Sequence, residues 1–237
     1  MIGPELGAEW VGSVGVPAEG PRARRSVANE ATVKAIRDFA SAGKSRIGVL
    51  NFASAKNPGG GFLNGAMAQE ESLAASSGLY RTLLRHERYY MANRACGTMS
   101  YTDHAIYSPD VVFFRDERFG LVGEPLAASV LTLPAVNYGQ VLLKGEDPAE
   151  ALRIMKNRMR LALAIFAKQG DRHLVLGAYG CGVFRNDPVL VARRWKELLD
   201  GEGYGVLFEE VRFAVLDGSK NGKCIRAFEE AFGKSGE

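Results

Sequence analysis

The chain alternates short apolar runs with longer stretches in which apolar residues recur at helical spacing. Apolar runs bounded by turn residues predict buried strands, and apolar residues on one face of a helical repeat predict amphipathic helices. We therefore expect strands over residues 46–52, 127–136, 173–179 and 211–217, and an extended segment over 105–115 that is interrupted at Pro109. Helices are expected over residues 26–42, after Glu71, from 148 to 169, after Pro188 and over 221–232.

Two Asp-Pro pairs give the clearest local signals for helix starts. Asp147-Pro148 and Asp187-Pro188 each offer a carboxylate that can cap the free N–H groups and a proline suited to the first helical position. Gly170 is a natural stop for the first of these helices. This long helix carries an apolar stripe that we interpret as core filling, made of Leu152, Met155, Met159, Ala162 and Phe166.

Strands that alternate with helices of this length predict an α/β fold with a mainly parallel sheet covered on both faces. We expect one domain over residues 26–237, preceded by a loose N-terminal arm over 1–25 that is rich in Gly, Pro and Ala. The arm closes with Arg22, Arg24 and Arg25, which are read either as solvated surface or as an arm that contacts a polymer or phosphate. Residues 86–104 are expected to be irregular.

The composition is that of an ordinary globular protein, with 46% hydrophobic and 24% charged residues among 237. A net charge of +3 suits a polyanionic ligand but predicts no sequence-specific nucleic-acid binding. Three widely spaced cysteines suggest neither a disulfide framework nor a zinc site, and they fit a reducing cytoplasm. No apolar run approaches membrane-spanning length, and the N-terminus lacks the features of a secretory signal, so we expect a cytoplasmic protein without membrane contact.

The most informative stretch is NFASAKNPGGGFLNGAMAQEE, residues 51–71. It follows a predicted strand, and ligand sites of open α/β sheets lie at the carboxyl ends of strands. Gly59, Gly60 and Gly61 let the backbone approach a ligand closely, where a Cβ atom would clash. Glu70 and Glu71 are candidates for acid/base chemistry. A flexible loop would explain the glycines alone, and an acidic helix start would explain the glutamates alone. The presence of both in one stretch favours a functional site.

A second glycine-bearing loop, GAYGCGVF, follows the strand expected over residues 173–179. Its backbone N–H groups precede a helix and suit a diphosphate. Because parallel strands deliver their loops to one edge of the sheet, both loops can converge on one ligand. Neither loop has the GxxxxGK[ST] or the full GxGxxG spacing. We therefore expect backbone N–H groups to hold the diphosphate, with no cofactor and no obligatory metal.

Three glycines, a seven-residue spacer and Gln69-Glu70-Glu71 resemble the signature of poly(ADP-ribose) glycohydrolases, and NFASAKNPGGG is similar to their bacterial branch. The resemblance implies a three-layer α/β/α macrodomain-like fold with a mainly parallel mixed sheet. It also implies hydrolysis of the ribose–ribose bond of poly(ADP-ribose), on ADP-ribosylated proteins, with a preference for the polymer end and with ADP-ribose as product.

Carried over residue by residue, the resemblance makes Glu71 the acid/base and lets Glu70 orient the leaving ribose. Gln69 completes the motif and is expected to bind substrate. Gly59 to Gly61 would hold the distal ribose and phosphate. The second loop would cover the diphosphate with Gly180, Cys181, Gly182 and Val183, and Phe184 would press the terminal ribose towards Glu71. Asn51 stands where macrodomains place the first Asn of an N-x-x-N pair and is expected to bind substrate, but Ser54 replaces the second Asn.

The sequence is also compatible with several alternatives. The chain could be a non-catalytic reader of ADP-ribose, or a hydrolase of another ADP-ribose linkage on protein or DNA. Cys181 could be a nucleophile, although packing explains a small residue in a tight turn. The three histidines lack metal-ligand spacing. Asn137 is a weaker candidate for the pocket, and Tyr89, Tyr90 and Tyr101 could each stack on adenine.

Overall fold

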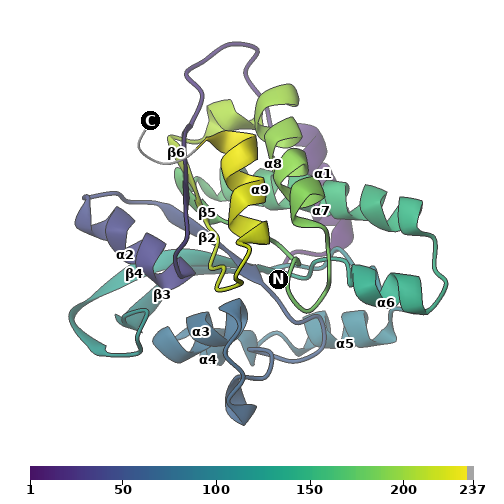
Figure 1. Cartoon of the computed structure of the whole chain (residues 1–237), viewed down its shortest axis with the longest axis horizontal. Coiled ribbons are helices and arrows are strands. Elements are labelled where there is room, and N and C mark those ends of the chain that lie inside the picture. The colour runs from purple at the N-terminus through teal and green to yellow at the C-terminus, as the bar shows by residue number, and fades with distance from the viewer. Residues whose placement is uncertain (234–237) are drawn as a thin grey trace.

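The computed structural model describes residues 1–233 and shows a central sheet between two layers of helices (Figure 1). The strand order is β1-β6-β5-β2-β4-β3. The pairs from β1 to β4 are parallel, and only β3 runs antiparallel to its neighbour β4. The strands are β1 (Arg24–Ala28), β2 (Ile47–Phe52), β3 (Ile106–Arg115), β4 (Leu121–Leu133), β5 (His173–Leu176) and β6 (Glu210–Ala214).

Both faces of the sheet are buried, as the apolar strand sequences require. In β2, Leu50 belongs to one apolar core and Val49 to the other, because neighbouring side chains point to opposite faces. One layer contains α1 (Pro4–Ser13), α7 (Pro148–Gln169), α8 (Pro188–Lys196) and α9 (Lys223–Phe232). The other layer contains α2 (Thr32–Ser41), α3 (Gln69–Ser76), α4 (Leu79–Leu83) and α5 (Glu87–Ala95).

Shorter elements complete the fold. Helix α6 (Tyr138–Leu143) follows β4, and the 3-10 turn η1 (Phe62–Asn64) lies in the connection between β2 and α3. A π-helical turn, η2 (Glu197–Gly201), extends α8, and a second 3-10 turn, η3 (Tyr204–Leu207), leads to β6. The predicted α/β/α architecture with a mainly parallel mixed sheet is confirmed.

The local helix signals are also confirmed. The Asp147 carboxylate accepts a hydrogen bond from the Ala149 N–H at 2.8 Å, and Asp187 accepts one from the Val189 N–H at 2.8 Å. The proline that follows each aspartate occupies the first turn. The long helix ends at Gly170, as expected.

The N-terminal region differs from the loose arm expected over residues 1–25. Pro4 opens helix α1, which packs along α7 so closely that a Cβ atom on Gly7 would stand 3.0 Å from Leu161. Ile2 is buried and forms an antiparallel bridge with Ala105. The order of this region was not predicted because the residues that it contacts lie far away in the sequence. The predicted domain over 26–237 stays a prediction, and its last four residues, 234–237, lie outside the described part of the chain.

Three further expectations were wrong in detail. The helix predicted from residue 26 begins at Thr32, because Arg24–Ala28 forms the edge strand β1 beside β6. The strand expected over residues 127–136 begins earlier, because β4 starts at Leu121 and pairs with β3 from there. The segment 86–104 contains helix α5, whose buried Tyr89 and Tyr90 face the sheet. Within residues 1–233, no helix is long and apolar enough to cross a membrane.

Candidate active site

A cleft of about 890 Å³ opens at the carboxyl ends of the parallel strands. It is bounded by the first glycine loop (residues 57–61), the start of α3 and the second glycine loop (residues 177–186). The chain after β1 and the chain after β6 close the other sides, through residues 30–32 and 214–216. The two loops therefore meet at one edge of the sheet, as the sequence predicted.

The side chain of Gln69 holds the start of α3 against β2. Its Oε1 accepts a hydrogen bond from the Phe52 N–H at 2.9 Å, and its Nε2 donates to the Leu50 carbonyl at 2.9 Å and to Thr32 Oγ1 at 3.3 Å. The amide thus mimics a strand partner at the end of β2. Gln69 lies at the wall of the cleft, but its polar atoms are engaged with the protein.

Glu70 is almost completely buried at the base of the cleft, with 3% of its surface exposed. One carboxylate oxygen accepts a hydrogen bond from the Ser54 N–H at 2.7 Å, and the other accepts one from Asn51 Nδ2 at 3.2 Å. Burial raises the pKa of this carboxyl to about 8, against the opposing effect of these hydrogen bonds, and the neighbouring Glu71 adds to the rise. Glu70 therefore retains its proton at neutral pH.

Glu71 is half-buried and faces the first glycine loop. Its Oε1 accepts a hydrogen bond from the Gly61 N–H at 2.8 Å. Gly60 has a φ of 60°, and a Cβ atom there would stand 2.3 Å from the same oxygen. The sequence predicted that the glycines bring the backbone close to a ligand. In the structure, the absence of a side chain at Gly60 is what makes room for the carboxylate.

Asn51 and Ser54 hold the carboxyl group of Glu70 in place. Asn51 is fully buried at the end of β2, and its Nδ2 also donates to Thr132 Oγ1 at 3.1 Å, so it does not line the cleft. Ser54 occupies the position of the second Asn, and its N–H is the donor to Glu70. Its hydroxyl accepts hydrogen bonds from the backbone of Asn57 and Lys56 and so shapes the start of the loop.

The second glycine loop is shaped by Asn186, which the sequence reading did not single out. Asn186 Nδ2 donates to the Val136 carbonyl at 2.8 Å and to the Gly180 carbonyl at 3.0 Å. Gly180 has a φ of 73°, and a Cβ atom there would stand 2.6 Å from Asn186. The space beside Gly182 is open, and Val183 is 85% exposed. The loop is thus closely packed at Gly180, whereas Gly182 and Val183 are open to solvent.

Cys181 lines the cleft but is poorly suited to be a nucleophile. Burial raises the pKa of its thiol well above the ordinary range, so the thiolate is disfavoured. The packing interpretation is therefore favoured for Cys181.

The tyrosines and Asn137 separate into different environments. Tyr89 and Tyr90 are buried in the core between helix and sheet, so they are wrong as candidates for stacking on adenine. Asn137 caps α6 by accepting a hydrogen bond from the Gln140 N–H, and it does not line the cleft. Tyr101 packs against Phe184, with ring centroids 6.0 Å apart.

The fold and the site together define an α/β/α protein of the macrodomain type with two carboxylates beside a glycine loop. A family model described as microbial-type PARG, catalytic domain, matches residues 11–116. The chain is similar to the poly(ADP-ribose) glycohydrolase of Deinococcus radiodurans solved in complex with ADP-ribose, at 43% identity and a TM-score of 0.91, with 97% of this chain and 92% of that chain covered.

A second similar structure is the poly(ADP-ribose) glycohydrolase of Thermomonospora curvata, at 40% identity and a TM-score of 0.92, with 97% of this chain and 84% of that chain covered. The same enzyme bound to the inhibitor ADP-HPD matches at 39% identity and a TM-score of 0.90, with 97% and 83% covered. Curated protein sequences give no match. The chain belongs to the microbial-type poly(ADP-ribose) glycohydrolase family. The resemblance stated from the sequence is confirmed.

Proposed function

We propose that the protein hydrolyses the ribose–ribose O-glycosidic bond of poly(ADP-ribose) carried by ADP-ribosylated proteins, with Glu71 as the acid/base. The main support for the assignment of Glu71 is the position of its carboxylate at the cleft. The carboxylate is fixed by the Gly61 N–H at 2.8 Å in space that only a glycine at position 60 leaves open. The relatives from Deinococcus and Thermomonospora are poly(ADP-ribose) glycohydrolases, and the first holds ADP-ribose.

The proposed reaction uses one carboxyl group twice. Glu71 gives its proton to the leaving ribose oxygen as the bond from that oxygen to the anomeric carbon breaks, and positive charge develops on the remaining ribose. A water molecule then adds to the anomeric carbon, and Glu71 takes its proton back from that water. Most glycosidases place two carboxylates on opposite sides of the bond. Glu70 and Glu71 are adjacent in the first turn of α3, which favours one acid/base and one orienting group.

Glu70 is the orienting group in this proposal. Because its pKa lies at about 8, its proton is present at neutral pH and can be donated to a ribose hydroxyl on the leaving side. A neutral Glu70 also avoids placing a second negative charge next to Glu71 once Glu71 has given up its proton in the reaction. Asn51 and Ser54 would act through Glu70, because both donate hydrogen bonds to its carboxyl.

The second glycine loop would bind the diphosphate. Among residues 1–233, the backbone N–H groups of Gly182 and Val183 donate to no protein acceptor, and they lie at the open side of the loop. Free N–H groups at a loop beside the cleft suit phosphate oxygens. Gly180 and Cys181 belong to the packed part of this loop, and Phe184 would press the terminal ribose towards Glu71. The first loop, Gly59 to Gly61, would hold the distal ribose and phosphate.

Product analysis tests this function against its two rivals. Purified protein would be incubated in parallel with poly(ADP-ribose) on protein and with single ADP-ribose units on protein or DNA. We expect free ADP-ribose from the polymer and intact single units. Tight ADP-ribose binding without release from any substrate would support a reader, and release from the single units would support a hydrolase of another linkage.

Two finer points belong to the same proposal. Attack at the polymer end is suggested by the likeness to bacterial members of the family, and it predicts single ADP-ribose units rather than oligomers among the early products. A cytoplasmic location is suggested by the three free cysteines, which a reducing compartment would preserve. Cell fractionation would test it.

A further inference from the structure

Two residues that adjoin Phe184, a residue of the cleft wall, adopt a backbone conformation that bulky side chains rarely take. Tyr101 has a φ of 59°, and Arg185 has a φ of 57°. Such left-handed positions cost free energy in any residue except glycine, and they persist only where the surroundings hold them. Tyr101 contacts the ring of Phe184, and Arg185 is the next residue after Phe184. Both residues with an unfavourable backbone conformation therefore adjoin Phe184.

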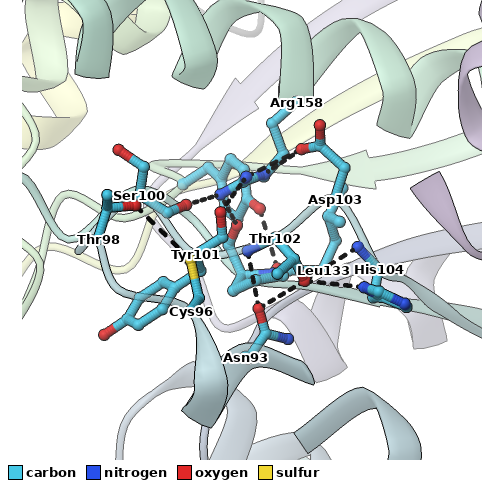
Figure 2. A network of polar contacts seen from close by, with 12 residues as sticks. Asn93, Cys96, Thr98, Ser100, Tyr101, Thr102, Asp103, His104, Leu133 and Arg158 are labelled. Carbon is cyan, nitrogen blue, oxygen red and sulfur yellow. Dashed lines mark hydrogen bonds and ion pairs between the residues drawn. The ribbon is translucent and has the colours of Figure 1, made fainter. Parts of the chain in front are cut away.

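Tyr101 belongs to a segment over residues 98–104 that a buried arginine holds in place. Arg158 projects from α7 and is 1% exposed. Its Nε donates to Asp103 at 2.9 Å, and its two terminal nitrogens donate to the carbonyl oxygens of Ser100, Tyr101 and Pro134. Figure 2 shows Arg158 beside Ser100, Tyr101 and Asp103, with the segment running past it. A buried cation needs such partners, so the segment and Arg158 fix each other.

The other side of the segment is fixed by α5 and by residues near α6. Asn93 is fully buried, and its Oδ1 accepts hydrogen bonds from the N–H and the hydroxyl of Thr102, both at 2.9 Å (Figure 2). The Met99 N–H donates to the Glu146 carboxylate, and the Met99 carbonyl accepts from the Asn137 N–H at 2.9 Å. The Tyr101 backbone therefore lies between anchored neighbours on both sides.

Phe184 is also held through its own backbone. Its carbonyl accepts a hydrogen bond from the Gly139 N–H at 3.0 Å. The Arg185 side chain lies against Gly139 so closely that a Cβ atom on Gly139 would stand 2.9 Å from it. Phe184 itself lines the cleft. The ring is thus fixed by its main chain on one side and by Tyr101 on another.

We infer that Tyr101 and Arg158 are positioning residues for the reaction, because Tyr101 supports the Phe184 ring and Arg158 holds Tyr101 in place. The inference rests on the proposed function, in which Phe184 presses the terminal ribose towards Glu71. Neither residue touches the reacting atoms. Without the support, Phe184 would change its side-chain orientation and the ribose would be less well aligned, while the diphosphate contacts of the loop would remain.

A pair of substitutions at Tyr101 tests the inference. Tyr101→Gly removes the ring and also relieves the unfavourable backbone, so it should fold well. We expect its kcat on poly(ADP-ribose) to fall about tenfold, since small misalignments of a substrate are costly. Its Kd for ADP-ribose should change less than about twofold, because a group acting mainly in the transition state changes kcat rather than binding. Tyr101→Phe keeps the ring and should retain most of the wild-type kcat.

A double variant tests the role of Arg158. Arg158→Lys keeps the charge but loses the fork that reaches three carbonyls. If Arg158 acts through Tyr101, the double variant Tyr101→Gly, Arg158→Lys has the same kcat as Tyr101→Gly alone. Independent, multiplicative losses would overturn this part of the inference. A wild-type kcat in Tyr101→Gly would overturn the role of Tyr101.

Fluorine NMR on protein labelled with fluorophenylalanine separates this inference from the proposed function, because it needs no turnover. The Phe184 signal, assigned with Phe184→Leu, should be single and sharp in wild type and in Tyr101→Phe. It should shift or split in Tyr101→Gly. An unchanged signal in Tyr101→Gly would overturn the inference even if hydrolysis is observed. If the wild type releases no ADP-ribose, the proposed function fails while the signal still reports whether Tyr101 positions Phe184.

Discussion

Replacing Gly60 with alanine should disable the site while leaving the protein folded. Real Cβ atoms essentially never come within 3.0 Å of such a neighbour, but the new Cβ would stand 2.3 Å from Glu71 Oε1. The carboxylate oxygen must therefore move by at least 0.7 Å, the difference between these distances. It also loses its alignment with the Gly61 N–H. A misplacement of about 1 Å can cost on the order of 10²-fold in rate. We expect a loss of about that size in kcat.

The loss of activity in Gly60→Ala must be separated from a loss of stability. A left-handed alanine costs about 1–2 kcal/mol, which should appear in urea unfolding. Gly65 offers a matched position, because its φ is 79° and a Cβ atom there meets nothing within 4 Å. Gly65→Ala should lose similar stability and keep its activity in the release of ADP-ribose from polymer. Full activity in a folded Gly60→Ala variant would refute the idea that this loop sets the position of Glu71.

The remaining predictions concern the support of the site and one distant carboxyl. Gln69→Ala should lower the free energy of unfolding by about 2–4 kcal/mol in denaturant titrations, because the Phe52 N–H and the Leu50 carbonyl lose their partner; a change within error would contradict the role of the Gln69 amide. Burial raises the folded-state pKa of Glu70 from 4.5 to about 8, so its contribution to stability is fully present below 4.5 and is lost as the pH rises through 8. Glu70→Gln cannot ionise, and its stability relative to wild type should rise across this window by at most about 5 kcal/mol, which is the difference between pKa values of 4.5 and about 8 at about 1.4 kcal/mol per pH unit; parallel pH profiles would contradict the raised pKa. Asp171 is buried far from the cleft, where it accepts a hydrogen bond from the Tyr107 hydroxyl at 2.9 Å, and burial raises its pKa from 3.8 to about 7. The stability of Asp171→Asn relative to wild type should therefore rise as the pH increases from about 4 to about 7, without a change in kcat. Thermal unfolding measured across this pH range tests the prediction, and a constant difference between the two proteins would contradict it.

The predictable parts of this molecule depend on local chemistry. Asp147 and Asp187 cap their helices through backbone groups two residues away, so the sequence alone could place both helix starts. The edge of the sheet at which both glycine loops meet also followed from the alternation of strands and helices. The helix starts depend only on residues within one short stretch of sequence. The position of the loops follows from the regular connections between parallel strands.

Other parts depend on partners that are distant in the sequence. Gln69 was assigned to substrate binding, but its amide pairs with β2 residues that lie 17 and 19 positions earlier. Asn186 holds the second loop through Val136, which is 50 positions away, and no local signal marks it. Helix α1 packs on α7, which begins more than a hundred residues later. Such contacts become visible only when the chain is folded.

The acid/base role of Glu71 is tested most directly by Glu71→Gln, which keeps an oxygen for the Gly61 N–H and changes only the ionisable group. Single-turnover release of ADP-ribose from poly(ADP-ribose) would be measured beside calorimetric binding of ADP-ribose. We predict a rate at least about 10²-fold below wild type, as expected for loss of a general acid/base, with ADP-ribose binding retained. A wild-type rate in Glu71→Gln would contradict the assignment of Glu71 as the acid/base.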